Sequence, residues 1–166
     1  MTQTTPSDDR RELLRLYLAD HRAGSVGGIS LARRMASSEH RHASQVKVLE
    51  GELNESQHGL DRIMSLVGAQ RSAVKDAVAA AGERLGRLKS NGRFVRRSPL
   101  SDVVELELLA CGLAGQRQLW RALSNLGDEL PAEARSIVAD RSTVVEDQIG
   151  RVDAWHQEAV LATAMR

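Results

Sequence analysis

Residues 44–68 read SQVKVLEGELNESQHGLDRIMSLVG, and this stretch decides the fold class. Its apolar side chains recur at steps of three and four residues, the period of a helix with one buried face. They are Val46, Leu49, Leu53, Leu60, Ile63, Met64 and Val67. Gly68 is a suitable stop, because glycine readily adopts the left-handed backbone conformation that ends many helices. The pattern predicts a helix over about 44–66.

Three further segments show the helical period. The first begins at Ser7, a good N-cap, and a polar turn over 37–44 separates it from the helix just described. Its expected inward stripe is Leu13, Leu16, Tyr17, Asp20, Gly24, Gly27, Leu31 and Met35. Another helix begins at Ser98-Pro99 and continues to about Leu126, and Pro131 opens the last one. No segment has the alternating pattern of a strand.

Residues 69–98 form a long connection between the second and third of these helices. Ser72–Ala81 is rich in alanine and predicts a short helix, and a basic run ending at Arg97 follows it. A connection of this length with some helix of its own suits a crossover between two helical hairpins. We therefore predict one all-α domain over 1–166, an antiparallel four-helix bundle with a crossover over 69–98 and a disordered N-terminus over 1–6.

Composition excludes several classes of protein. Aromatic residues make up 2% of the 166 residues, so the interior must be built from aliphatic side chains, which favours closely packed helices. The net charge of +1 gives no strong attraction to nucleic acid or to an anionic membrane. Cys111 is the only cysteine, which excludes an internal disulfide, fits a cytoplasmic protein and is expected to be a buried, inert thiol. No apolar run is long enough to span a bilayer.

Three glycines, Gly24, Gly27 and Gly28, lie in the middle of the first predicted helix. Each costs up to about 1 kcal/mol of helix stability relative to alanine. Two explanations are open: a neighbouring helix approaches closely, or the glycines leave space for a ligand. The sequence favours close packing.

Acidic residues stand three positions before three of the five histidines, in Glu39/His42, Glu55/His58 and Asp153/His156. Residues at this spacing share one face of a helix, so both side chains can reach one ion. A carboxylate with an imidazole is a suitable ligand pair for iron, manganese or zinc.

The expected hairpins place further acids opposite two of these pairs. If the first turn is centred on residues 37–38, Asp20 lies level with Glu55. If the second is centred on residue 129, Glu105 lies level with Asp153. Each hairpin then offers one acid on one helix and an acid-x-x-His pair on the other. Whether Glu105 or Glu107 faces the interior stays open.

The order carboxylate, Glu-x-x-His, crossover, Glu, acid-x-x-His resembles the di-metal pattern of ferritin-like proteins. The stretches LYLADHRAGSVGGISLARR (16–34) and GRFVRRSPLSDVVELELL (92–109) are also similar to a bacterial family of helical bundles with ferritin-like architecture. This resemblance implies a ferritin-like fold and metal sites for iron or manganese. It implies terminal carboxylates at Asp20 and Glu105, bridging carboxylates at Glu55 and Asp153, and histidine ligands at His58 and His156.

Two functions follow as alternatives. The first is a ferritin-like bundle that binds iron or manganese through a degenerate carboxylate and histidine site. The second is a metal-free interaction or scaffold protein whose acids pair with arginine and whose basic crossover binds an acidic protein partner. An apolar remainder on such long helices favours a homodimer. Binding to nucleic acid is disfavoured, because Phe94 is the only aromatic residue of the basic run. Binding to a membrane surface is disfavoured because this run has no apolar face.

Overall fold

The computed structural model describes residues 6–69 and 98–164. Within these residues the chain forms four α-helices and one 3-10 turn, and no strand occurs. The helices are α1 (Pro6–Ala36), α2 (Ala43–Leu66), α4 (Pro99–Ser124) and α5 (Ala132–Ala164), with the 3-10 turn η1 (Gly127–Glu129) between the last two. For these residues the prediction of an all-helical fold is confirmed. Most of the predicted crossover, 70–97, and residues 1–5 of the predicted disordered N-terminus lie outside the described residues.

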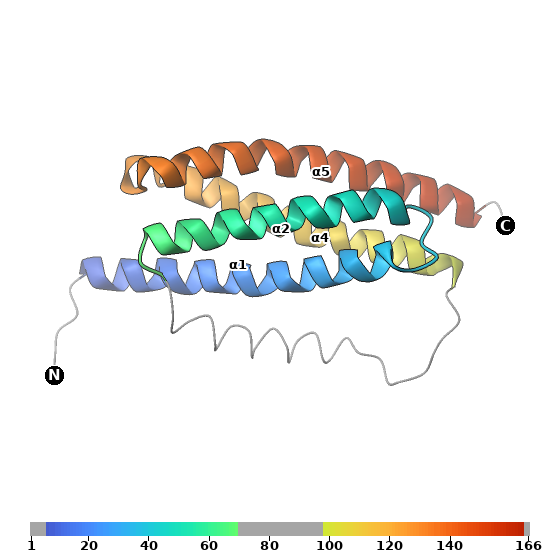
Figure 1. Ribbon diagram of the computed structural model, residues 1–166, viewed down its shortest axis with the longest axis horizontal. Coiled ribbons are helices and arrows are strands. Elements are labelled where there is room, and N and C mark those ends of the chain that lie inside the picture. Colours follow the sequence, from blue (N-terminus) through green and yellow to red (C-terminus); the bar gives the residue numbers. More distant parts are fainter. Residues whose placement is uncertain (1–5, 70–97, 165–166) are drawn as a thin grey trace, which may run out of the picture.

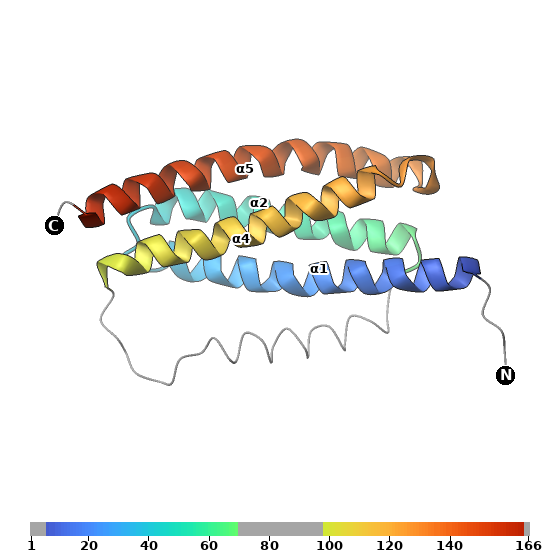
Figure 2. The same ribbon diagram turned by 180° about the vertical axis from the view of Figure 1, so that it is seen from behind.

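The four helices lie side by side along one long axis (Figure 1). α1 and α5 form opposite sides, and α2 and α4 lie between them, as the view from behind shows (Figure 2). α1 therefore packs mainly against α2 and α4, and α5 mainly against α4 and α2. α2 ends beside the start of α1, whereas α4 starts beside the turn that joins α1 to α2.

The end of α2 is set by Gly68, as predicted. Gly68 has a φ of 69°, a conformation that glycine adopts at little cost. Its N–H donates to the Ser65 carbonyl at 3.2 Å, and the Ala69 N–H donates to the Met64 carbonyl at 2.7 Å. These two bonds are those of a Schellman motif, which satisfies carbonyls that the last helical turn leaves unpaired.

The start of α4 is set by Ser98, also as predicted. The Leu100 N–H donates to Ser98 Oγ at 3.3 Å, and the Ser98 N–H donates to Ser101 Oγ at 3.1 Å. This reciprocal pair is a capping box, and Pro99 is the first helical residue. At the other end of the chain, Pro6 already lies in α1, so that helix begins before Ser7, consistent with the suitability of proline for a first helical turn.

The core lies on the predicted face of α2 but on a different face of α1. Every predicted apolar position of α2 from Val46 to Met64 is buried. On α1, by contrast, Leu13 and Leu16 are 66% and 47% exposed, so the predicted inward stripe was wrong at these two positions. Other members of that stripe do face the core: Met35 is buried, and Tyr17 and Leu31 pack against it. The buried side chains of α1 are Leu18, Ala19, Ala23, Ile29, Ala32 and Met35. α1 carries apolar residues on two faces, and the helical period alone does not say which of them turns inward.

Candidate functional site

The six predicted metal ligands are not brought together as one site. Among the described residues, one group of three histidine, cysteine or acidic side chains has ligand atoms all within 4.8 Å of one another: His40, Asp102 and Glu105. Glu105 is the only one of the six in this group. Four of the others are exposed, namely Asp20, Glu55, His58 and Asp153. His156 is half-buried, with Nε2 3.3 Å from Glu107 Oε1.

The register of the first hairpin explains why Asp20 and Glu55 do not meet. Arg22 Nε lies 2.5 Å from Asp61 Oδ1, and Arg33 Nε lies 2.9 Å from Glu50 Oε1. Between these two pairs the residue number rises by 11 on α1 and falls by 11 on α2, so two residues back from Arg22 corresponds to two residues forward from Asp61. Asp20 is thus level with Ile63, eight residues beyond Glu55, a displacement of roughly 12 Å along a helix.

The second hairpin is displaced in the same sense. Glu107 faces His156, and Arg117 Nη1 lies 3.7 Å from Glu146 Oε2. This register places Glu105 level with residue 158, five residues beyond Asp153. The side chain of Glu105 is 13% exposed and that of Glu107 is 57% exposed, so Glu105 is the more buried of the two.

Acidic side chains near the core pair with basic ones. Glu50, which is buried, accepts from Arg33 at 2.9 Å and from Lys47 at 2.6 Å. These two donors hold the pKa of Glu50 below its ordinary value of 4.5. Glu52 accepts from Arg151 in the same way. The pairing of acids with arginine, one of the two alternatives, therefore occurs at Glu50 and Glu52, where no metal ligand was expected. It also occurs at two predicted ligands, since Glu55 lies 3.6 Å from Arg141 and Glu105 lies 3.4 Å from Arg34.

The group of His40, Asp102 and Glu105 does not fit a metal ion as it is arranged. The His42 N–H donates to His40 Nδ1 at 3.0 Å, so the neutral ring carries its proton on Nε2. That nitrogen lies 3.9 Å from Asp102 Oδ1. A protonated nitrogen has no lone pair for a metal, and Glu105 also lies 3.4 Å from Arg34. The group fits a polar link between the first turn and α4.

His42 lies at the same end of the molecule as this group, and its imidazole ring is buried. Its ring stacks on Trp155, with centroids 5.8 Å apart and planes 17° apart. Its Nε2 lies 3.7 Å from Glu158 Oε2. Burial lowers the pKa of His42 from its ordinary value of 6.5, and the charge of Glu158 offsets only part of this effect.

Acid is expected to destabilise the protein through His42. Between the ordinary pKa of 6.5 and the lowered native pKa, the unfolded chain binds a proton that the native protein does not. The free energy of unfolding should therefore fall as the pH drops through this window. Urea unfolding at about pH 7.5 and about pH 5.5 measures the fall. It should be smaller in His42→Gln, and an equal fall in both proteins would contradict this role.

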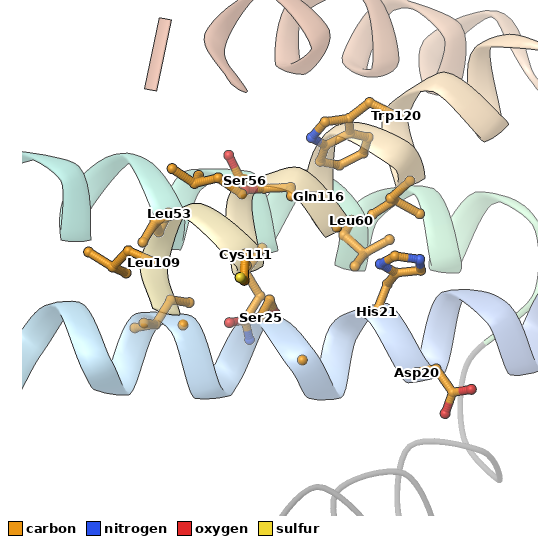
Figure 3. A pocket seen from close by; sticks show the side chains of 18 residues that line it. Asp20, His21, Ser25, Leu53, Ser56, Leu60, Leu109, Cys111, Gln116 and Trp120 are labelled. Atoms are coloured by element: carbon orange, nitrogen blue, oxygen red, sulfur yellow. The ribbon is translucent and has the colours of Figure 1, made fainter. Parts of the chain in front are cut away.

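A pocket of about 320 Å³ lies between α1, α2 and α4 (Figure 3). Its walls are mainly aliphatic side chains from all three helices: Ile29, Leu53, Leu60, Leu109, Leu113 and Leu119. Its volume is at the lower end of the range for ligand pockets, which runs from about 300 to about 1,000 Å³.

Glycines from both sides line this pocket, Gly24 and Gly28 on α1 and Gly112 and Gly115 on α4. A Cβ atom added at any of the four would meet nothing within 4 Å. The close-packing explanation is therefore wrong for Gly24 and Gly28. Gly59 on α2 shows what a packing glycine looks like, because a Cβ there would lie 3.1 Å from Ile137. The pocket glycines leave open space instead.

Two buried residues of the pocket carry a polar side-chain group, Ser56 at 2% exposed and Trp120 at 1% exposed. Among the described residues, the indole Nε1 of Trp120 has no hydrogen-bond partner. That nitrogen exposes less than 1 Å² of surface, so the ring lines the pocket without presenting its N–H to it.

Besides Cys111, two ionisable residues line the pocket, His21 and Asp20. The ring of His21 lies edge-on to Tyr17 at 4.6 Å, and burial lowers its pKa from 6.5, with Asp20 opposing this effect. Asp20 is exposed and turns away from the other labelled side chains (Figure 3). No lysine or arginine is among the described residues that line the pocket.

Cys111 is exposed and lines the pocket. The expectation of a buried thiol was wrong, because Cys111 lies on the α4 face that also carries Gly112 and the exposed Leu108. Sequence reasoning also missed Trp120. The signal available in the sequence was the run of helix-interior glycines, but close packing was the explanation that the sequence favoured for them.

No protein-family model, curated protein or solved structure matches the chain. In the described ranges 6–69 and 98–164, no helix is both long enough and apolar enough to cross a membrane.

Proposed function

We propose that this protein binds a small apolar molecule in the pocket between α1, α2 and α4. The observation that carries the proposal is the pocket itself, about 320 Å³ with mainly aliphatic walls, which four helix glycines leave open. Mainly apolar walls with a few placed polar groups are typical of small-molecule sites.

The four pocket glycines support the same function. Each costs up to about 1 kcal/mol of helix stability relative to alanine, and no neighbouring side chain occupies the space in return. They keep the region between α1 and α4 free of side chains. Space for a ligand explains glycine at these positions, whereas close packing does not, because an added Cβ at any of the four meets no atom within 4 Å.

The architecture that we propose for this binding protein is an antiparallel, ferritin-like four-helix bundle in the cytoplasm. The opposite chain directions within each hairpin support it. So does the position of the α2 end and the α4 start at opposite ends of the bundle, which a long connection must join (Figure 1). The metal set of that class is not part of the proposal, because the six implied ligands do not converge.

Cys111 provides the test, because it is the only cysteine of the chain and lines the pocket. Naphthalene, a neutral apolar probe, should slow the reaction of Cys111 with a thiol reagent, and the slowing should saturate with probe concentration. The matched control combines Cys111→Ser with Ser136→Cys, which moves the thiol to an exposed position on α5. Its rate should not change. An unchanged rate at Cys111, or equal slowing of both thiols, would remove the proposal.

Metal binding is the second candidate function, and the group of His40, Asp102 and Glu105 is the observation that favours it. The proton on His40 Nε2 opposes it. We expect no saturable rise in Tm when Mn(II) or anaerobic Fe(II) is added. A metal at 100 times its Kd would stabilise the fold by about 2.7 kcal/mol, a shift of several degrees. A shift of that size that Asp102→Asn abolishes would establish a metal site.

The predicted homodimer and the predicted acidic partner of the basic crossover stay predictions. Exposed Leu13, Leu16 and Leu108 are compatible with a dimer, and light scattering decides between 18.1 kDa and twice that mass. Residues 84–97 lie outside the described residues. Capture of an acidic partner that fails when Arg93, Arg96 and Arg97 are replaced by Glu would support the second prediction.

A further inference from the structure

We infer that the ligand of the pocket is a molecule with one unbranched aliphatic chain of about ten carbons, which lies along the helix axes. This inference rests on the proposed function and adds the shape and chemical class of the ligand. The length of the pocket, its volume and the polarity of its two ends carry it.

The pocket is long compared with its width. Its lining extends on α1 from Asp20 to Ile29, on α2 from Leu53 to Leu60, and on α4 from Leu109 to Trp120. Because a helix rises by about 1.5 Å per residue, these stretches are about 14, about 10 and about 16 Å long. The space between them is therefore a channel along the bundle rather than a round cavity.

The three stretches lie side by side, so the same ends meet. The register of the first hairpin places Ile29 level with residue 54 on α2. The start of α4 lies beside the end of α1 (Figure 2), and Arg34 lies 3.4 Å from Glu105. Counting back from Arg34 and forward from Glu105 places Ile29 level with residue 110. One end of the channel is thus bounded by Ile29, Leu53 and Leu109.

The volume of the pocket matches one extended chain of this length. An aliphatic chain with bonds of about 1.5 Å advances about 1.3 Å per carbon, so about 14 Å holds about eleven carbons. A methylene group takes about the space of a water molecule, about 30 Å³, so 320 Å³ holds about ten. Length and volume thus agree on a chain in single file. A compact molecule of equal volume would be wider than the channel.

The described lining residues give the two ends of the channel different polarity. Ile29, Leu53 and Leu109 make one end apolar. At the other end Asp20 is exposed and His21 is half-buried, so water reaches this end. We therefore expect the methyl group of the chain beside Leu109 and its polar end towards His21.

The 1-alkanols from 1-hexanol to 1-dodecanol test this inference, with binding measured by protection of Cys111. Each added methylene group should tighten binding about fourfold until the chain fills the channel at about ten carbons, and further carbons should add nothing. 1-Adamantanol has as many carbons as 1-decanol but holds them in a compact cage. It should bind at least about tenfold more weakly than 1-decanol.

A variant tests the direction of the chain. Leu109→Ala lengthens the channel at its apolar end, so the longest chain that still gains affinity should be longer by about two carbons. Leu130→Ala is the matched control, because Leu130 is also buried but does not line the pocket. It should leave the preferred chain length unchanged. The alkanol series on the unchanged protein does not depend on the folding of either variant.

The outcomes separate this inference from the proposed function. If neither naphthalene nor any alkanol protects Cys111, the proposed function fails. If naphthalene protects and the alkanols do not, the inference alone fails. It also fails alone if affinity is independent of chain length or keeps rising to 1-dodecanol, if 1-adamantanol binds as tightly as 1-decanol, or if folded Leu109→Ala keeps the original preferred length.

Discussion

The double variant Gly28→Leu, Gly112→Leu is expected to bind naphthalene at least about 100-fold more weakly than the unchanged protein. This loss would remove nearly all of the specific binding of the probe. The two glycines lie on opposite sides of the pocket, on α1 and α4, and an added Cβ at either position meets no atom within 4 Å. Leucine side chains can therefore occupy this space without displacing the backbone. Because they take the volume that the ligand needs, binding is lost by exclusion rather than by misfolding.

The same substitutions should stabilise the protein. Replacing a helix-interior glycine by leucine gains up to about 1 kcal/mol of helix stability per site. Gly150→Leu is the matched control, since Gly150 lies in α5 with open space around its Cβ and does not line the pocket. It should gain stability without a change in affinity. Urea unfolding and probe titration measure the two effects, and unchanged affinity in the double variant would place the binding site elsewhere.

Trp120→Ala is expected to lower the free energy of unfolding by about 3–5 kcal/mol, the cost of removing a large aromatic side chain from a core. Trp120 is 1% exposed and packs in the main core cluster. Small domains have about 5–15 kcal/mol in total, so this variant approaches the limit of folding.

Circular dichroism during urea unfolding measures this loss. Leu108→Ala on the same helix is the control, because Leu108 is 46% exposed and its truncation should change stability by about 0.5 kcal/mol or less. A loss below about 1 kcal/mol for Trp120→Ala would show that the indole is not a core side chain.

The helices could be predicted where local signals act alone. Ser98 and Gly68 fix the start of α4 and the end of α2 through hydrogen bonds to residues two to five positions away. The buried face of α2 was also predicted correctly, because its apolar residues form a single stripe. In each case one short segment contains the whole physical cause.

The register between helices could not be predicted in this way. Arg22 pairs with Asp61, and this long-range contact shifts Asp20 away from Glu55. The sequence contains two apolar faces on α1, and only packing against α2 and α4 decides that Leu18 turns inward and Leu16 outward. A metal site requires side chains to align across helices. The register expected from the sequence was wrong, so the predicted ligands lie apart in the structure.

The pocket could not be predicted from the sequence for a similar reason. Gly24 and Gly28 are visible in the sequence as costly positions, but a glycine that admits a neighbouring helix and one that leaves space look the same there. The distinction depends on what surrounds the absent Cβ. Trp120 and Cys111 join the same pocket from another helix, about 90 residues along the chain, which no local pattern indicates.

The most direct test of the pocket is a crystal structure of the protein soaked with 2-bromonaphthalene. The anomalous signal of bromine locates the probe without dependence on the interpretation of weak density. We expect one ordered bromine between α1, α2 and α4, within contact distance of Trp120 and the pocket glycines. A bromine ordered only elsewhere, or none in this pocket at a probe concentration that saturates binding in solution, would contradict the proposed function.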